Sequence, residues 1–433
     1  MNVPGRRTRD RFRALPLALA LLLPAGCDSG SPGRPSLVDA GAATDAPPLD
    51  VSPEDGAPDP TADAAPGVDG ETDAGTDGGA TDAPTSPGPW SVAAGSLHVC
   101  AWRDDAVFCW GQNHAGELGT GDQSDWQGPG RGPGLTGVRH VVAGDHHTCA
   151  ADRDGLVWCW GANDSGQLGD GTNDGHLAPT QVPGLGGVTM LAAGRGHTCA
   201  LAASGVVHCW GDDCCGQTGP LGDMTRPQAV LNLNDAVEIA AGYVHSCARH
   251  ADGRISCWGP NSYGELGDGN DLLSTYPADV VGLTAPAVQL VSGTFHVCAR
   301  LADGATMCWG QGEHGALGDG NESNSNGPRA ITMPPGEVAA QLAPAGASCA
   351  RLASGRVACW GGNANGELGD GTTQASRLVP GLAPGLEDAV GVAGLCAVRA
   401  AGPVVCWGPN AYGQIGDGTR TTRNTPTPVL GLP

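Results

Sequence analysis

The 433-residue chain contains no lysine, and all 22 of its basic residues are arginine. Schiff-base chemistry and the P-loop phosphate site both need the lysine amine, so both are excluded. The Gly-x-Ser-x-Gly elbow of serine hydrolases is also missing. The longest apolar run, Ala14 to Leu23, has about ten residues and is too short to cross a bilayer as a helix.

Stretches that could form a helix are missing as well. The chain holds 72 glycines and 34 prolines, and they recur throughout its repeated part. Each of them would interrupt a helix, so we expect none in the repeated unit.

The chain does contain a regular repeat. Cys-Trp-Gly occurs seven times, with Trp at 110, 160, 210, 258, 309, 360 and 407, so the period is 47 to 51 residues. Each period has a Gly, a His three residues later, a Cys two residues after that, a turn, a second Cys, Trp-Gly and a GxLGxG-like tail. The segment between the two cysteines predicts a β-hairpin, with Asp252-Gly253 as its turn in repeat 4. Short strands and glycine turns at this period are typical of propeller blades and exclude helical solenoids.

The pattern GxxHxCAL…CWGxNxxGQLGDG resembles the RCC1 (regulator of chromosome condensation) repeat, over about residues 90 to 433. The resemblance implies an all-β, seven-bladed propeller. Repeat 6 departs from the pattern at Pro344 and Ala347, repeat 7 at Gly391 and Gly394, and repeat 3 at Thr218. We expect these copies to form degenerate blades.

Two segments precede the predicted propeller of residues 90–433. Residues 1–27 have an arginine-rich start, an apolar core and a small-residue site that ends in Cys27, as an export signal does. The site resembles the bacterial lipobox, which implies lipidation of Cys27; Pro24 departs from its usual leucine, and ordinary secretion is the alternative. Residues 28–89 carry 13 acidic residues against Arg34 and predict a disordered, extended tether. Ca²⁺ binding by this tether is the weaker alternative, because no DxDxDG spacing occurs.

The two ends of the propeller suggest how the ring closes. Residues 425–432 read like the lead-in at 179–185 that precedes repeat 3, and no repeat follows them. We therefore predict that they add a strand to the blade of Trp90.

The 17 cysteines comprise Cys27, seven pairs and Cys214-Cys215. The spacing within each pair places the two cysteines opposite one another in a hairpin, and export supplies an oxidising compartment, so we predict disulfides. Zinc sites would need converging ligands, and buried thiols would need the export prediction to be wrong. Cys214-Cys215 is a possible vicinal disulfide or a pair of reactive thiols. The predicted bonds are Cys100–Cys109, Cys149–Cys159, Cys199–Cys209, Cys247–Cys257, Cys298–Cys308, Cys349–Cys359 and Cys396–Cys406.

Polar residues that recur once per blade cannot meet at one ion, so we predict no metal and no catalytic residue among them. Five histidines are expected to make structural hydrogen bonds within each blade: His98, His147, His197, His245 and His296. Glutamate and glutamine alternate at one repeat position, which a catalytic carboxylate would not tolerate. These residues are Glu117, Glu265, Glu367, Gln167, Gln217 and Gln414. No cofactor is predicted.

The net charge of −23 consists of +4 in residues 1–27, −12 in the tether and −15 in the propeller, which makes nucleic acid a poor partner. Candidate binding residues lie in predicted rim loops: Trp126 and Arg131 in the loop 122–134, with Tyr263 and Tyr276 as further aromatic anchors, and a second long loop at 320–335.

These features predict a monomeric, non-enzymatic lipoprotein of a bacterial cell envelope that faces the periplasm or the cell exterior and binds a protein or glycan. One alternative is a polysaccharide-acting enzyme, which carboxylates of raised pKa at the central axis would favour. The other is a secreted inhibitor, since some RCC1-like bacterial propellers inhibit β-lactamases.

Overall fold

The computed structural model describes residues 89–433 except 104, 105, 133, 220–223 and 401. The predictions of an export signal, of lipidation at Cys27 and of a tether over residues 28–88 therefore lie outside the described residues. Within the described ranges, no helix is long and apolar enough to cross a membrane.

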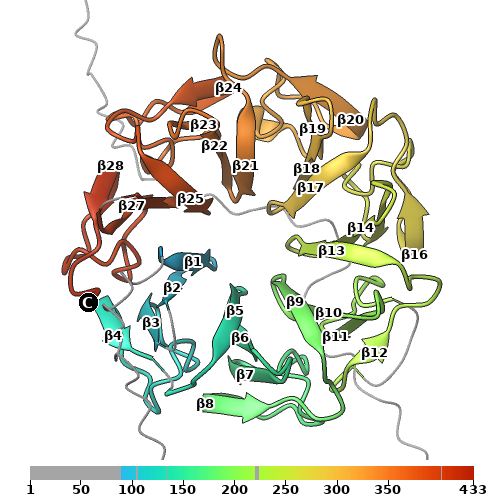
Figure 1. The fold of residues 1–433 in the computed structure, drawn as a ribbon, viewed down its shortest axis with the longest axis vertical. Coiled ribbons are helices and arrows are strands. Elements are labelled where there is room, and N and C mark those ends of the chain that lie inside the picture. Colours follow the sequence, from blue (N-terminus) through green and yellow to red (C-terminus); the bar gives the residue numbers. More distant parts are fainter. Residues whose placement is uncertain (1–88, 104–105, 133, 220–223, 401) are drawn as a thin grey trace, which may run out of the picture. The chain divides into compact units, whose positions relative to one another are not determined.

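Seven four-stranded antiparallel sheets form a ring around a central channel (Figure 1). The all-β, seven-bladed propeller is thereby confirmed, and the degenerate repeats 6 and 7 form complete blades. The only helical element in the described part is a single 3₁₀ turn, η1 (Glu313–Gly315).

Each blade runs outward from the channel in chain order. The first strands are β1 (Ser91–Ala94), β5 (Val138–Ala143), β9 (Val188–Ala193), β13 (Ala236–Ala241), β17 (Ala287–Ser292), β21 (Ala339–Pro344) and β25 (Ala389–Ala393). The second strands are β2 (His98–Arg103), β6 (His147–Asp152), β10 (His197–Ala202), β14 (Ser246–His250), β18 (His296–Leu301), β22 (Ala347–Leu352) and β26 (Cys396–Arg399).

The third strands are β3 (Ala106–Gly111), β7 (Val157–Gly161), β11 (Val207–Gly211), β15 (Ile255–Gly259), β19 (Thr306–Gly310), β23 (Val357–Gly362) and β27 (Val404–Gly408). The outer strands are β4 (Trp126–Arg131), β8 (His176–Gln181), β12 (Gln228–Ala229), β16 (Ser274–Asp279), β20 (Ser325–Ile331), β24 (Ser376–Leu382) and β28 (Arg423–Pro428).

Proline limits the pairing of the outer strands. An outer strand leaves one edge unpaired, and proline cannot donate a hydrogen bond from that edge to another chain. The prolines are Pro129, Pro179, Pro277, Pro328, Pro380, Pro426 and Pro428 within the outer strands, and Pro227 directly before β12.

The seven predicted disulfides are present. In every blade the two cysteines are direct partners across the second and third strands, with Cα atoms 4.0 to 4.1 Å apart. Direct opposition is the geometry that a bond between neighbouring strands needs. The predicted hairpin at Asp252-Gly253 is confirmed, since Gly253 has φ +86° between β14 and β15.

The structure corrects the prediction of how the ring closes. The C-terminal segment does not join the blade of Trp90: β28 pairs with β27 and completes the last blade, while β1 to β4 form the first blade without it. The lead-in of each repeat is thus the outer strand of the preceding blade. The C-terminal residues instead pack sideways on the first blade, where Val429 and Leu432 join the cluster around Trp90.

Removing residues 425–433 should still lower the melting temperature, for this different reason. The last blade would lose most of its outer strand together with Val429, which is 4% exposed. Losing one buried aliphatic side chain and several strand hydrogen bonds costs about 3 kcal/mol or more. A thermal melt checks this, with removal of residues 431–433 alone as the control that leaves β28 intact; equal melts for both truncations would contradict it.

The tryptophan of each Cys-Trp-Gly joins two blades. All seven indoles are 0 or 1% exposed, and each Nε1 donates to a backbone carbonyl of the preceding blade over 2.8 to 3.1 Å. The glycine that follows takes a left-handed backbone: Gly161 has φ +104°, and a Cβ there would lie 2.5 Å from the carbonyl oxygen of His146. The tripeptide is therefore the joint between blades.

The recurring histidines also act between blades, which corrects the prediction of bonds within each blade. His98 Nε2 lies 2.8 Å from Thr148 Oγ1 of the next blade, and Thr148 Oγ1 donates to the Glu117 carbonyl. Because that hydroxyl hydrogen is used, His98 Nε2 is the donor. The same bond joins His147 to Thr198, His197 to Ser246 and His296 to Ser348.

The glycine three residues before each histidine makes room for the ring. A Cβ on Gly144 would lie 2.3 Å from a carbon of the His147 ring. Repeat 6 has Ala347 in place of the histidine and tolerates Pro344 in place of the glycine. The two departures from the repeat thus have one cause.

His245 differs from the other four. It is fully buried, and neither ring nitrogen has a partner among the described residues, because the next blade presents Val297 where the others present a hydroxyl. Val297→Thr should place a hydroxyl between His245 Nε2 and the Glu265 carbonyl and raise the free energy of unfolding by about 1 kcal/mol. Chemical denaturation measures it. Val99→Thr is the control, because the preceding blade has Gly394 and no histidine; an equal gain there would contradict the assignment.

A candidate binding face at the channel mouth

Two sets of loops emerge at the same end of the ring, because the strands of each blade alternate in direction. The inner loops join first to second strands at residues 95–97, 144–146, 194–196, 242–245, 293–295, 345–346 and 394–395. The outer loops join third to outer strands, in the described part, at residues 112–125, 162–175, 212–219 with 224–227, 260–273, 311–324, 363–375 and 409–422. The inner loops surround a cavity of about 390 Å³ at the end of the central channel, here called the channel mouth.

The inner loops line this mouth with their recurring glycines and with the first of the residues that the repeat leaves free. Between the recurring Gly and His of the inner loops lie two residues that differ in every copy. They are Ser96-Leu97, Asp145-His146, Arg195-Gly196, Tyr243-Val244 and Thr294-Phe295. Variation at two positions between fixed ones was a signal visible in the sequence, and it identifies the mouth better than loop length does.

On one side of the mouth, an arginine and three aromatic rings contact one another in series. The Arg195 guanidinium lies 5.2 Å from the ring centre of Tyr243, Tyr243 packs edge-on against Phe295 at 5.3 Å, and Phe295 packs against Tyr263 at 5.5 Å. Tyr243 and Phe295 belong to inner loops of neighbouring blades, and Tyr263 to an outer loop. Arginine and tyrosine are frequent anchors of protein interfaces.

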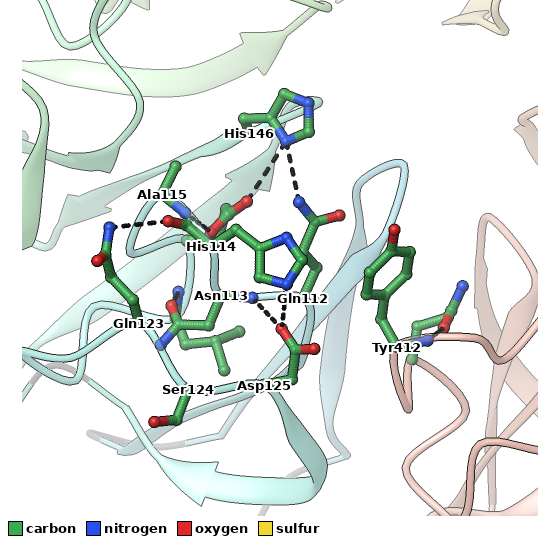
Figure 2. A network of polar contacts seen from close by, with 12 residues as sticks. Gln112, Asn113, His114, Ala115, Gln123, Ser124, Asp125, His146 and Tyr412 are labelled. Atoms are coloured by element: carbon green, nitrogen blue, oxygen red, sulfur yellow. Dashed lines mark hydrogen bonds and ion pairs between the residues drawn. The ribbon is translucent and has the colours of Figure 1, made fainter.

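A polar network continues this side (Figure 2). His146 Nδ1 lies 3.4 Å from the Glu117 carboxylate and 3.5 Å from the Gln112 amide nitrogen, and Asp145 lies 3.6 Å from His146 Nε2. The hydrogen bond to Glu117 raises the pKa of His146 above its ordinary value although partial burial opposes it. Burial opposes ionisation of Glu117, but the hydrogen bonds from His146 and backbone N–H groups hold the pKa of Glu117 below its ordinary value.

Glu265 occupies the same repeat position as Glu117 in a different environment. It is 1% exposed, and the next inner loop offers Phe295 where His146 faces Glu117. Burial raises the pKa of Glu265 to about 7, even though its carboxylate accepts the Tyr263 N–H at 2.8 Å.

The opposite side of the mouth is small and apolar. Pro344, Ala345, Gly346 and Leu395 line it, together with Pro409 of an outer loop. These residues belong to repeats 6 and 7, the copies that depart from the pattern. The mouth is therefore polar and aromatic on one side and, apart from Glu367, apolar on the other.

The predicted binding residues do not converge on one site. The segments 122–134 and 320–335 are not long loops, because they contain β4 and β20. Trp126 begins β4 and packs against two hydrophobic clusters, and Arg131 ends the same strand. Tyr276 lies in the outer strand β16, half exposed and away from the mouth, whereas Tyr263 belongs to the ring stack beside it.

Cys214 and Cys215 lie in the third outer loop, with Cys214 exposed. Gln217 Oε1 accepts the Cys215 N–H at 3.1 Å. The predictions of a vicinal disulfide and of reactive thiols both stay predictions.

The described residues hold no group of three or more His, Cys, Asp or Glu that could bind a metal ion. Two carboxyls near the axis have raised pKa values, but each has its own structural partner. Burial raises the pKa of Glu238 against the effect of its 2.7 Å bond to Arg249, and Glu238 also accepts the Leu290 N–H of the next blade. Glu265 accepts the Tyr263 N–H of its own outer loop.

The fold and the mouth define a disulfide-bonded propeller whose free positions gather on one concave face. The chain belongs to the RCC1-like domain family, whose model matches residues 85–394.

Solved structures share this fold. Prp20p of Saccharomyces cerevisiae is 21% identical, with a TM-score of 0.68 over 76% of this chain and 87% of that one. Human WBSCR16 is 22% identical, with a TM-score of 0.65 over 76% and 94%. At these identities the likeness shows the fold alone.

Curated relatives match short segments. The human E3 ubiquitin-protein ligase HERC2 is 33% identical over 111 residues, which are 24% of this chain and 2% of that protein. The probable human E3 ubiquitin-protein ligase HERC3 is 40% identical over 84 residues, 19% of this chain and 8% of that protein. The chain thus spans a small fraction of the length of these relatives.

Proposed function

We propose that this chain is a non-enzymatic lipoprotein of a bacterial cell envelope whose propeller binds a partner at the channel mouth. The proposal rests on one observation: some positions of the repeat make structural contacts, and others line the cavity. The recurring His, Cys and Trp make bonds between and within blades, and the first of the two free positions in each inner loop lines one cavity. Residues without a structural duty that converge on a concave surface are the usual material of a binding site.

The disulfides support the location. Seven bonded pairs suggest an oxidising extracellular or periplasmic environment. The lipid anchor rests on the sequence around Cys27. Intact mass of the protein purified from its own envelope tests the anchor: we expect acylation at Cys27, and an unmodified Cys27 would contradict it.

Affinity capture from envelope extract tests the binding face. Full-length protein and the variant Tyr243→Ser are compared, and the control Tyr276→Ser changes a half-exposed tyrosine away from the mouth. We expect a partner retained by the wild type and the control and reduced about tenfold or more by Tyr243→Ser, as for an interface anchor. Equal capture by all three proteins would contradict binding at the mouth.

A further inference from the structure

The charge of the propeller is concentrated on one face. Counting residues whose place the structure describes, the inner and outer loops hold 18 acidic residues and three arginines, a net charge of −15. The remaining described part of the propeller holds 10 acidic residues and 13 arginines, a net charge of +3. Composition alone hides this asymmetry.

Some of the loop charge is neutralised at the outer edge. Arg329, Arg377 and Arg423 of the outer strands pair with Asp319, Asp370 and Asp417 of the outer loops. Even with these three arginines counted, the loop face keeps a net charge of −12. A charge of that size on one face raises the local concentration of cationic partners and speeds their association.

The channel mouth is a candidate binding site for a cationic side chain at the centre of this face. Asp145 and the ring of Tyr243 line one side of its cavity of about 390 Å³, and Glu367 lines the opposite side. Arg195, the only arginine in the inner loops, also lines the cavity and lies over one face of the Tyr243 ring, so an incoming cation would contact the rest of that ring. The cavity is large enough for a long side chain to enter.

A buried acceptor without a donor lies beside the mouth. Gln112 is 5% exposed, and its Oε1 has no hydrogen-bond partner in the part of the chain that the structure describes, while its Nε2 faces His146. Glu117, fully buried, is a second acceptor on the same histidine. An unpaired buried acceptor is costly, and turning the amide would let Oε1 accept the His146 Nδ1–H that faces it.

We propose that the channel mouth and the acidic outer loops bind a basic segment of a partner protein, with one arginine or lysine side chain of that segment entering the cavity against Asp145 and Tyr243. This inference rests on the proposed binding function and names the chemistry of its partner. Acidic polysaccharides and nucleic acids are repelled by the same face.

The test uses full-length protein and three probes: a fluorescein-labelled peptide of nine arginines, the same peptide with nine glutamates, and a neutral dextran. Fluorescence anisotropy at pH 7.5 gives affinities at 20 and 150 mM NaCl. The acidic segment at 28–89 is identical in every variant, so its contribution cancels in comparisons.

Two triple variants separate the faces. Asp164→Asn, Asp271→Asn and Glu322→Gln neutralise exposed outer-loop carboxylates, and Asp154→Asn, Asp303→Asn and Glu387→Gln neutralise exposed carboxylates on the opposite face. We expect the first triple to weaken arginine-peptide binding about fivefold to tenfold at 20 mM NaCl, and less at 150 mM where the Debye length is about 8 Å. The second triple should leave affinity unchanged within about twofold.

The mouth is tested by Asp145→Asn and Tyr243→Ser, each expected to weaken arginine-peptide binding at both salt concentrations because the contact is short-ranged. Equal weakening by the two triples would overturn the inference in favour of general charge attraction. Dextran binding that Tyr243→Ser abolishes, without arginine-peptide binding, would overturn it while leaving the proposed binding function standing. No effect of either mouth variant on any probe or on capture from envelope extract would overturn both.

Discussion

Replacing Trp110 by phenylalanine is expected to lower the free energy of unfolding by about 4 kcal/mol, more than the same change at any joint that keeps its histidine bond. Trp110 Nε1 donates to the Gln414 carbonyl and so joins the last blade to the first. Phenylalanine would leave a cavity and a buried carbonyl without its donor, which together cost about this much.

In the part that the structure describes, the closing joint has few other hydrogen bonds between its blades. The last blade has no histidine to reach across, and Val99 offers no hydroxyl to receive one. The first strand of the last blade has Gly391 where Gln289 and Gln341 use their side chains to bridge to the next blade. Exposed contacts such as Arg420 to Asp125 remain, and pairs of that kind contribute little.

Trp210→Phe is the matched control. The joint between the second and third blades keeps the His147–Thr198 bond. The Gln167 carbonyl loses the Trp210 donor in this variant but still accepts a hydrogen bond from Thr198 Oγ1. We expect a loss of about 2 kcal/mol there, mainly from packing. Urea denaturation of both variants measures the difference. Equal losses would mean that the closing joint is no weaker than the others.

Glu265→Gln is expected to stabilise the protein by about 3 kcal/mol at pH 8 and by little at pH 5. The pKa of Glu265 is about 7 in the folded protein, against an ordinary value of 4.5. Between these values the folded protein keeps a proton that the unfolded chain releases, so stability falls as the pH rises and is lowest above pH 7. At about 1.4 kcal/mol per pH unit this amounts to about 3 kcal/mol.

The chain itself shows that glutamine fits this position. Gln414 Oε1 accepts the Tyr412 N–H at 3.0 Å, just as Glu265 accepts the Tyr263 N–H. Comparing melts of variant and wild type at each pH cancels the titration of the five buried histidines. A gain of equal size at pH 5 and pH 8 would contradict the assignment.

Glu117→Gln is expected to change the stability at pH 8 in the opposite direction to Glu265→Gln. The pKa of Glu117 lies below its ordinary value, so its ionised form contributes stability at neutral pH that is lost as the pH falls. Glutamine should therefore not stabilise the protein at pH 8. Phe295→His would place an imidazole over Glu265 as His146 lies over Glu117, and we expect it to reduce the penalty at pH 8.

Much of the blade could be predicted from the sequence because its contacts are local. The cysteines of a pair are nine or ten residues apart, and a hairpin over that distance leaves them opposite one another. The outer strands were harder to predict from the sequence. β4 (Trp126–Arg131) contains two glycines and a proline and shows no alternation, so Trp126 and Arg131 were wrongly predicted in a loop. Pairing with β3, a tertiary contact, makes that segment a strand.

The sequence by itself determined the repeat, the number of blades, the disulfide partners and the positions left free between Gly and His. Only the tertiary structure decided which blade each histidine and tryptophan serves, how the ring closes and which face carries the charge. The Trp160 indole and its acceptor at Glu117 are 43 residues apart, nearly one period. A periodic pattern looks the same whether such a bond closes within a blade or reaches the next one, because only the curvature of the ring brings neighbouring copies together.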